Sequence, residues 1–278
     1  MRIDCHQHFW KASRGDYHWM GPAVPALCRD YLPPDLQPLL KKNKIDKTIL
    51  VQAAQTTAET DFLLELAVQY DFIAGVIGWL DMDSPDFPRQ LEVYSKKPKF
   101  LGIRPMLQDL PDDDWILRPR VIDALKWIAD RDMPFEFLTY PRHLPHVLTV
   151  LDTVPGLRAV VDHVSKPEIK NRKLDPWRSL MSRVAEHPNV YCKLSGMITE
   201  ADFKTWTPDD LRPYVEHVLS CFGVGRVMFG SDWPVCLLAG SYDQVAAALQ
   251  AVVKPHLDKS GEAALFGENA ARFYQLAL

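Results

Sequence analysis

The sequence predicts a (β/α)8 barrel, and three observations favour this fold. Segments rich in β-branched and apolar residues alternate about eight times with amphipathic segments, which is the order of strands and helices in such barrels. Several of the apolar segments are apolar throughout, as strands of a parallel sheet are when both faces are buried. The chain has 278 residues, close to the roughly 250 typical of the fold, and contains no composition shift or linker. We therefore expect a single barrel domain over residues 1–278.

The predicted elements follow from periodicity and from the turn residues between them. Strands are expected at residues 3–9, 47–52, 72–79, 100–105, 134–138, 157–163, 190–195 and 226–232. Helices are expected at residues 33–40, 59–70, 88–95, 117–130, 143–151, 176–185, 208–222, 242–253 and 262–274. An open doubly wound sheet fits this order less well, because no glycine-rich phosphate loop follows a strand. Residues 11–31 interrupt the pattern with aromatic and turn-forming residues, and they are expected to form a lid over the active site.

Composition excludes several classes of protein. With 47% hydrophobic and 24% charged residues, the chain has the balance of a globular protein and not of a disordered or fibrous one. The formal net charge is -4 and no run of lysine or arginine occurs, so nothing favours nucleic acid or an anionic membrane surface as a partner. No apolar stretch approaches the ~20 residues of a membrane helix. The five cysteines are scattered and include no Cys-x-x-Cys pair, which favours reduced thiols in the cytoplasm.

Two histidines, His6 and His8, lie two residues apart in the first predicted strand. Because strand side chains alternate between faces, both imidazoles are expected on one face, together with Asp4. The other face carries apolar or amide side chains, namely Ile3, Cys5, Gln7 and Phe9. Neutral imidazole is the commonest protein ligand of metals such as zinc, so the spacing is compatible with a metal site. Taken alone, the spacing more often marks polar residues that face solvent at a strand end.

Ionisable and polar residues gather at the carboxyl ends of the other predicted strands. They are Arg104, Glu136, His163, Lys193, Ser195 and Asp232. In a (β/α)8 barrel these strand ends and the loops after them form the active face, so we expect these side chains to surround one site with the two histidines. Burying an unpaired charge costs several kcal/mol, which favours a functional reason for the cluster.

Each of these residues has a functional and a structural interpretation. Asp232 is expected to be catalytic, because His6, His8 and His163 supply partners for it, although an aspartate also caps turns. His163 is expected to belong to the site and not to be a satisfied core histidine. Glu136 is either a metal ligand or the partner of Lys193 or Arg104. Arg104 is expected to hold substrate oxygens through its forked guanidinium group.

Aromatic and hydroxyl side chains near these strand ends are candidate substrate contacts. Trp19 in the long loop and Trp233 directly after Asp232 suit stacking against a sugar-like ring, although tryptophans at such positions are as common in cores. Ser195 shares one face of the seventh predicted strand with Lys193, and it is expected to contact substrate as well.

Motifs along the whole chain resemble one protein family. They include Ile3-Asp-Cys-His-Gln-His-Phe-Trp10, Gly102-Ile-Arg104, Val161-Asp-His-Val-Ser-Lys-Pro167, Tyr191-Cys-Lys-Leu-Ser-Gly196 and Phe229-Gly-Ser-Asp-Trp-Pro-Val235. Together they resemble the amidohydrolase superfamily. Within it they are similar to the sugar-lactonase branch that includes L-fuconolactonase and L-rhamnonolactonase and is related to pyrone-dicarboxylate lactonase. The resemblance implies a (β/α)8 barrel, in agreement with the periodicity.

The resemblance also implies an activity, the hydrolysis of a sugar-acid lactone such as L-fuconolactone to the open-chain hydroxy acid. The paired histidines of the family match His6 and His8. Its later strand histidine matches His163, and its final-strand aspartate matches Asp232. For this reaction we expect Asp232 to act as general base and then acid. We expect His163, with Lys193 nearby, to stabilise negative charge on the carbonyl oxygen. We expect a single divalent metal, zinc, to be held by His6 and His8, with Glu136 and Asp232 as further candidate ligands.

Two departures from the wider superfamily leave alternatives open. Where its metal enzymes often carry a bridging lysine or glutamate in strand four and a histidine in strand five, this sequence has Arg104 and Glu136. A binuclear centre is therefore not expected, and metal-independent catalysis stays open, as the related pyrone lactonase branch implies. The alternative functions are a metal-dependent decarboxylase, a pyrone-dicarboxylate-type lactonase and a non-catalytic protein that binds a sugar or a metal.

Overall fold

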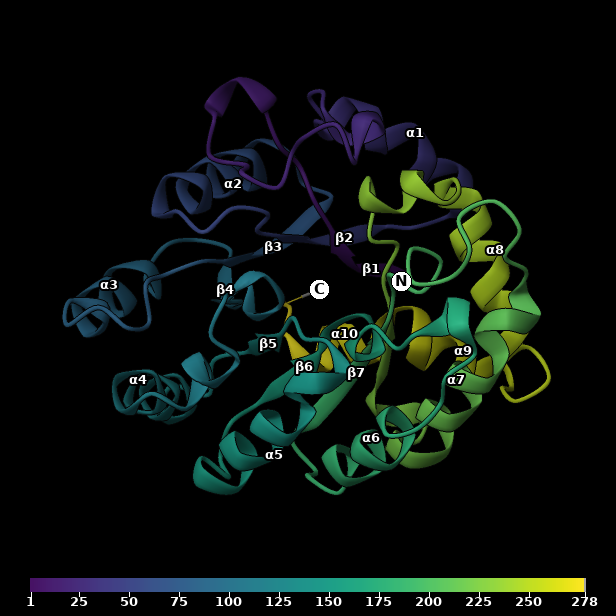
Figure 1. The fold of residues 1–278 in the computed structure, drawn as a ribbon. Helices are drawn as coiled ribbons and strands as arrows, with labels where there is room; N and C mark the ends of the chain where they lie inside the picture. Colours follow the sequence, from purple (N-terminus) through teal and green to yellow (C-terminus); the bar gives the residue numbers. More distant parts are fainter. Residues whose placement is uncertain (278) are drawn as a thin grey trace.

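Eight strands follow one another around a sheet in the order of the chain, each parallel to its neighbours (Figure 1). The computed structural model describes residues 1–277. The strands are β1 (Ile3–Gln7), β2 (Lys47–Val51), β3 (Ile73–Gly78), β4 (Phe100–Ile103), β5 (Phe135–Phe137), β6 (Ala159–Val161), β7 (Val190–Leu194) and β8 (Val227–Phe229). The ring closes where the chain after β8 meets β1, through a bridge between Gln7 and Trp233. The predicted (β/α)8 barrel is confirmed.

Helices surround this ring on its outer side, as Figure 1 shows. They are α1 (Pro33–Asn43), α2 (Thr57–Gln69), α3 (Phe87–Tyr94), α4 (Pro119–Asp130), α5 (Leu144–Thr153), α6 (Trp177–Ala185), α7 (Pro208–Phe222) and α8 (Tyr242–Val253). Their apolar stripes face the sheet, as Val121, Leu125 and Ile128 of α4 do. Residues 11–31 contain only short 3-10 turns, at Ala12–Arg14 and Pro25–Leu27. Among residues 1–277, no helix combines the length and the apolar character needed to cross a bilayer.

The C-terminal segment departs from the predicted continuous helix over residues 262–274. The structure has α9 (Lys259–Ala263), a π-helical turn (Ala264–Glu268) and α10 (Asn269–Phe273). The wide turn lies where Gly267 approaches the start of the chain, since a Cβ there would lie 2.2 Å from the carbonyl oxygen of Met1. This tertiary contact is invisible to helical periodicity. Beyond the turn, Phe273 and Tyr274 pack against the apolar side chains inside the barrel.

Strand β1 departs from strict alternation, and this changes the predicted position of Asp4. The register of β1 against β2 shifts between Asp4 and Gln7, as at a β-bulge, and both Cys5 and His6 face the barrel interior. Asp4 Oδ2 instead accepts a hydrogen bond from the hydroxyl of Tyr242 in α8, at 3.0 Å. The prediction that Asp4 shares a face with the two histidines is therefore wrong, because a bulge reverses the alternation.

Candidate active site

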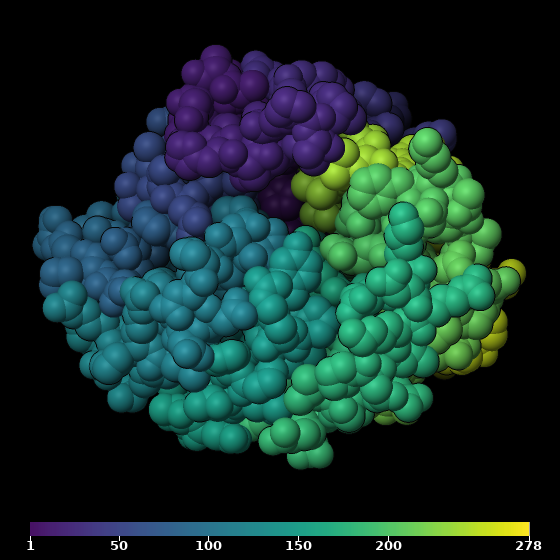
Figure 2. Space-filling view, in the orientation of Figure 1, coloured from purple at the N-terminus to yellow at the C-terminus, as the bar shows by residue number. Residues whose placement is uncertain are grey.

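A cavity of ≈ 260 Å³ lies at the carboxyl ends of the strands. Its polar lining consists of His8, Arg104, Gln108, Asp109, His163, Lys166 and Asp232. Its apolar lining consists of Trp10, Trp19, Val24, Leu27, Ala53, Met106, Leu138, Val235 and Leu238. Figure 2 shows a hollow near the centre of this face, bordered by the purple N-terminal segment. Four residues predicted at separate strand ends therefore share one pocket, namely His8, Arg104, His163 and Asp232.

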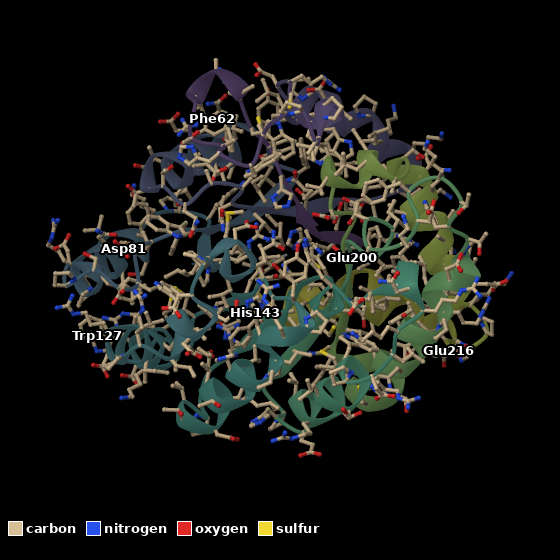
Figure 3. All side chains as sticks on the ribbon, viewed as in Figure 1. Phe62, Asp81, Trp127, His143, Glu200 and Glu216 are labelled. Atoms are coloured by element: carbon tan, nitrogen blue, oxygen red, sulfur yellow. The ribbon has the colours of Figure 1, made fainter. Side chains whose placement is uncertain are left out.

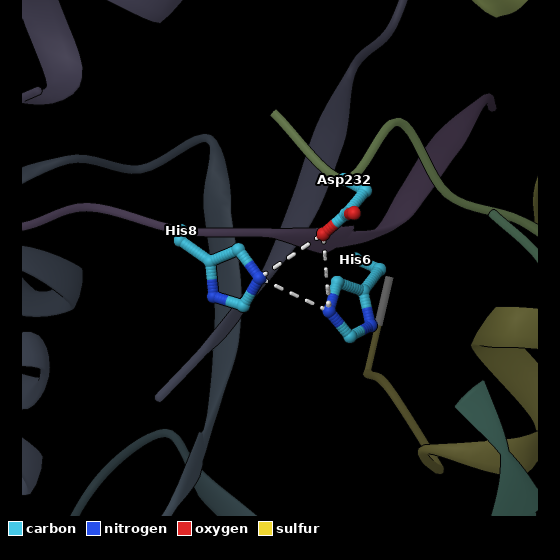
Figure 4. Close-up of side chains that lie close together, drawn as sticks. All are labelled: His6, His8 and Asp232. Atoms are coloured by element: carbon cyan, nitrogen blue, oxygen red, sulfur yellow. Dashed lines mark hydrogen bonds and ion pairs between the residues drawn. The ribbon is translucent and has the colours of Figure 1, made fainter. Parts of the chain in front are cut away.

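Three buried side chains meet at the inner end of this cavity (Figure 4). His8 Nε2 lies 3.2 Å from Asp232 Oδ1 and 3.2 Å from His6 Nε2. His6 Nε2 lies 3.8 Å from the same carboxylate oxygen. His163 approaches Asp232 as well, with its Nε2 3.8 Å from Oδ1. The structure thus brings together the histidines and the aspartate that the sequence places at the ends of strands one, six and eight.

The junction between β1 and the chain after β8 fixes the position of Asp232. The backbone N–H of Asp232 donates to His6 O at 2.8 Å, and the backbone N–H of His8 donates to Trp233 O at 2.8 Å. His8 Nδ1 lies 2.8 Å from Val51 O. Because a carbonyl oxygen only accepts, the ring hydrogen of neutral His8 is assigned to Nδ1, and Nε2 keeps a free lone pair. His8 therefore presents an acceptor, or a metal ligand, at the cavity.

Burial and neighbouring rings set the protonation state around Asp232. Burial raises the pKa of its carboxyl, but the imidazoles of His163 and His8 outweigh burial and hold this pKa below its usual value. Burial lowers the pKa values of His163 and His6 well below their usual range. At neutral pH, Asp232 is therefore a carboxylate, which is the state a general base requires.

His163 lies in a left-handed turn that follows β6, not in the strand that the sequence predicts up to residue 163. His163, Val164, Ser165 and Lys166 all have φ values between 48° and 58°. Such residues cost roughly 1–2 kcal/mol each, so the surrounding structure must hold the turn. One support is the hydrogen bond that Trp177 Nε1 donates to Val164 O at 2.6 Å. The turn brings both His163 and Lys166 to the cavity, and sequence analysis did not single out Lys166.

Ser195 and Gly196 support the ring of His163 on the side away from the cavity. Ser195 Oγ lies 2.8 Å from His163 Nδ1. A Cβ on Gly196 would lie 2.6 Å from the same ring, so the close approach requires glycine. Ser195 does not belong to the cavity lining within residues 1–277. The structure therefore gives Ser195 a contact with His163, and its predicted contact with substrate stays a prediction.

A buried cluster of charges centred on Lys193 lies next to His6. Lys193 Nζ lies 2.6 Å from Glu136 Oε2 and 3.1 Å from Asp162 Oδ1. It also donates to His6 Nδ1 at 3.1 Å. The hydroxyl of Tyr274 donates to Glu136 Oε1 at 2.5 Å, and burial raises the pKa of Glu136 to about 7. Of the alternatives open for Glu136, the structure has the ion pair with Lys193, and its role as a metal ligand stays a prediction.

Asp162 is a site residue that sequence analysis did not single out. Its carboxylate joins Lys193 to Arg104, whose Nη1 lies 3.2 Å from Asp162 Oδ2. Arg104 also donates through Nη2 to Gln52 O, and it lines the cavity while held in this way. The one sequence signal for Asp162 is its place beside His163 at a strand end, which periodicity alone cannot distinguish from a turn aspartate.

The two tryptophans predicted to contact substrate have different positions. Trp19 lines the cavity, and its Nε1 donates to Ala53 O at 2.7 Å. Trp233 is 2% exposed, and its ring packs edge-on against Tyr31 with ring centroids 5.3 Å apart. The ring of Trp233 is not part of the cavity lining that residues 1–277 form, whereas its backbone carbonyl holds the N–H of His8. Trp19 is thus the better placed of the two to meet a ligand.

His6, His8 and Asp232 could hold a metal ion, since their ligand atoms lie within 4.8 Å of one another. Around a tetrahedral zinc with ligands at about 2.0–2.1 Å, neighbouring ligand atoms lie about 3.3 Å apart. The separations of 3.2, 3.2 and 3.8 Å are close to this geometry. His6 fits less well, because both of its ring nitrogens face cationic donors: Lys193 Nζ lies 3.1 Å from Nδ1, and Arg104 Nη1 lies 3.4 Å from Nε2. Zinc on His6 Nε2 would compete with Arg104 for the same lone pair.

The chain is similar over its whole length to known amidohydrolases. The family model described as Amidohydrolase matches residues 3–276. The L-fucono-1,5-lactonase of Burkholderia ambifaria is 42% identical over 280 residues, which cover 99% of this chain and 96% of that protein. The L-fucono-1,5-lactonase of Burkholderia multivorans is 38% identical over 99% of this chain and 96% of that protein. A crystal structure of an amidohydrolase from Burkholderia multivorans with bound zinc has a TM-score of 0.95 and 37% identity, with 99% of each chain covered. The membership that the motifs imply is confirmed: the chain belongs to the amidohydrolase family.

Proposed function

We propose that this protein is a lactonase that hydrolyses a neutral sugar-acid lactone, such as L-fucono-1,5-lactone, to the open-chain hydroxy acid. The observation that carries the proposal is the buried, ionised Asp232 beside His8 and His163 at the inner end of a cavity. A cavity of ≈ 260 Å³ with mixed polar and apolar walls suits a single small ring that carries hydroxyl groups. The names of the two Burkholderia relatives support the same reaction.

In the proposed reaction, a water molecule beside Asp232 attacks the carbonyl carbon of the lactone. Asp232 accepts a proton from this water as the new carbon–oxygen bond forms. Negative charge then grows on the carbonyl oxygen, and it is stabilised by a ring N–H of His163 and by the positive field of Arg104 and Lys166. When the intermediate collapses, the bond from the carbonyl carbon to the ring oxygen breaks. Asp232 returns its proton to that ring oxygen, and the new carboxylic acid ionises.

Lys193 supports this chemistry from behind the site. It is fully buried and does not line the cavity that residues 1–277 form. Its ammonium donates to His6 Nδ1 and neutralises Asp162, which in turn holds Arg104. We therefore assign Lys193 a positioning role, in place of the direct stabilisation of the carbonyl oxygen that the sequence predicts.

A metal ion at this site would be zinc in our proposal, held by His8 and Asp232 with His6 as the third ligand. A bound zinc would polarise the lactone carbonyl and lower the pKa of a coordinated water. The base and the groups that stabilise the carbonyl oxygen are, however, side chains that the fold already holds in place.

Exhaustive chelation is expected to lower kcat for lactone opening at least about tenfold, because the carbonyl group and the attacking water would lose the cation that polarises them. The measurement is the rate of acid release by protein dialysed against a chelator, with metal content determined by elemental analysis of the same sample, and added Zn²⁺ is expected to restore the rate. Full activity in a sample without bound metal would contradict the zinc proposal and would assign water activation to Asp232 and the histidines alone.

A pyrone dicarboxylate is the second candidate substrate, and the charges of the pocket favour it less. Two carboxylate groups would need cationic partners. Arg104 is already paired with a buried aspartate, and the loop residues Arg118 and Arg142 pair with acids outside the cavity lining. Lys166 is the remaining cation of the lining, and Glu200 lies 3.7 Å from it. A neutral ring therefore fits the charge balance better.

An acid-release assay over a panel of lactones tests the proposed function. The purified protein is expected to release acid from at least one neutral aldonolactone faster than the spontaneous reaction does. Opening of a pyrone dicarboxylate without turnover of any aldonolactone would establish the second candidate. Carbon dioxide release from an aromatic acid would establish the decarboxylase alternative, and binding without turnover would indicate a non-catalytic protein.

A cytoplasmic location stays a prediction from cysteine usage. All five cysteines are unpaired thiols, and Cys5, Cys192 and Cys236 are buried. Unpaired thiols of this kind support a reducing compartment.

A further inference from the structure

Helix α2 carries a buried carboxyl group that takes no part in the mechanism above. Glu59 is 0% exposed and does not belong to the cavity lining that residues 1–277 form. Its carboxyl oxygens accept hydrogen bonds from the backbone N–H groups of Ala53, at 3.0 Å, and Ala54, at 2.8 Å. Burial raises the pKa of Glu59 to about 8, and these N–H groups offset only part of the cost of removing the group from water. Glu59 thereby fixes the turn that follows β2.

Helix capping does not account for the side chain of Glu59. Thr56 and Glu59 have the spacing of a capping box, in which the glutamate would bond back to the backbone N–H of Thr56. Thr56 does cap α2, since its Oγ1 accepts a hydrogen bond from the N–H of Glu59 at 3.0 Å. The carboxyl group of Glu59 instead accepts hydrogen bonds from the N–H groups of Ala53 and Ala54. The side chain therefore stabilises the turn after β2 and not the end of the helix.

The turn that Glu59 fixes also supports one wall of the cavity. Ala53 and Trp19 both line the cavity, and Trp19 Nε1 donates to Ala53 O at 2.7 Å. The carbonyl group of Ala53 and the N–H of Ala54 belong to the same planar peptide group and point in opposite directions. Glu59 therefore holds one end of this peptide group while Trp19 is bound to the other. A change in the orientation of the peptide group would break both hydrogen bonds.

Residues 11–31 are tied to the start of α2 at a second point. Thr56 Oγ1 donates to Asp16 Oδ2 at 3.0 Å, and Arg14 donates to the same oxygen at 2.8 Å. The guanidinium of Arg14 lies over the ring of Phe62 of α2, 5.0 Å from its centroid. Figure 3 labels Phe62 on α2, close to the purple N-terminal segment. The hydrogen bond of Trp19 is thus one of several contacts that hold this segment against the turn after β2 and the start of α2, and both of its partners line the cavity.

We propose that Glu59 is a positioning residue of the lactone pocket. It sets the orientation of the Ala53–Ala54 peptide group and through it holds Trp19, in a lid formed by residues 11–31, against the substrate ring. This inference rests on the proposed lactonase function. Because Glu59 acts on the wall that binds the ring and not on Asp232, its loss weakens substrate binding more than it slows the chemical step.

The test compares Glu59→Gln, Trp19→Phe and the double variant, with Glu65→Gln on the exposed face of the same helix as the matched control. Each single variant is expected to raise KM for the lactone about tenfold and to change kcat by less than about threefold, the effect of losing one hydrogen bond. The double variant is expected to resemble the single variants, because both residues act through one peptide group. Amide hydrogen exchange in residues 11–31 is expected to be faster in both single variants than in the control.

A wild-type KM together with wild-type exchange in Glu59→Gln would overturn the inference, and so would independent, multiplicative effects in the double variant. If Glu59→Gln does not fold, Trp19→Phe is the remaining test. A wild-type KM together with wild-type exchange in Trp19→Phe would also overturn the inference. A wild-type protein without lactonase activity would overturn the proposed function instead. The exchange measurement would then still decide whether Glu59 holds the segment that carries Trp19.

Discussion

Asp232→Asn is expected to lower kcat for lactone opening by between about a hundredfold and ten-thousandfold, the contribution typical of a general base. The amide has nearly the shape of the carboxylate, but it does not accept a proton from water at neutral pH. Its N–H can still donate to His8 Nε2, the ring atom that lies 3.2 Å from Asp232 Oδ1. The fold and the walls of the cavity should therefore persist, and KM should change much less than kcat. The measurement is the rate of acid release over a range of lactone concentrations.

Asp123→Asn, on the exposed face of α4, is the matched control for this variant. It is expected to keep the wild-type kcat, and thermal unfolding of both variants shows whether Asp232→Asn is folded under the assay conditions. Near-wild-type turnover by folded Asp232→Asn would remove Asp232 from the role of base.

Lys193→Met is expected to reduce the free energy of unfolding by about 3–5 kcal/mol, the cost of breaking a buried ion pair from one side. Lys193 is fully buried, and its ammonium is the shared partner of Glu136 and Asp162, at 2.6 and 3.1 Å. Without the ammonium group of Lys193, the carboxyl groups of Glu136 and Asp162 are buried without the cation that they share. At least one of them must then take up a proton. Chemical denaturation in urea at neutral pH measures the loss.

A second substitution separates charge from packing at this position. Adding Glu136→Gln to Lys193→Met removes one of the two buried carboxyl groups that have lost their cation. The double variant is therefore expected to regain part of the lost free energy of unfolding. Lys170→Met, on the surface, is the control and should cost less than about 1 kcal/mol, as is typical of exposed ion pairs. A loss below about 1 kcal/mol in Lys193→Met would mean that the buried cluster contributes little to stability.

The barrel and the core of the site could be predicted from the sequence because both depend on local patterns. Alternating apolar and amphipathic segments locate the strands, and the topology then brings the ends of parallel strands to one face. For this reason His6 in β1 and His8 directly after it could be expected to meet His163 and Asp232. The ion pair between Glu136 and Lys193 was open as an alternative, since a lone acid in an apolar strand needs a buried partner.

Features that depend on irregular backbone geometry could not be predicted in this way. The bulge in β1 moves Asp4 to the outer side of the strand, and no residue type in the strand signals it. The left-handed turn that brings Lys166 to the cavity has no glycine among its four residues. Glu59 matches a capping pattern, and only its contacts with the Ala53–Ala54 peptide group reveal another role. Tertiary contacts hold each of these conformations, so a pattern along the chain does not contain them.

The central claim is that a water molecule activated by Asp232 attacks the lactone carbonyl directly. A single turnover in water labelled with oxygen-18, with enzyme in excess over lactone, tests it by mass spectrometry of product and protein. The account predicts labelled oxygen in the carboxylate of the hydroxy acid and an unlabelled protein. An unlabelled product together with labelled oxygen on Asp232 would contradict the account, because it would show that the carboxylate attacks the carbonyl itself and forms a mixed anhydride, and that water enters only when this anhydride is hydrolysed at the aspartyl carbonyl.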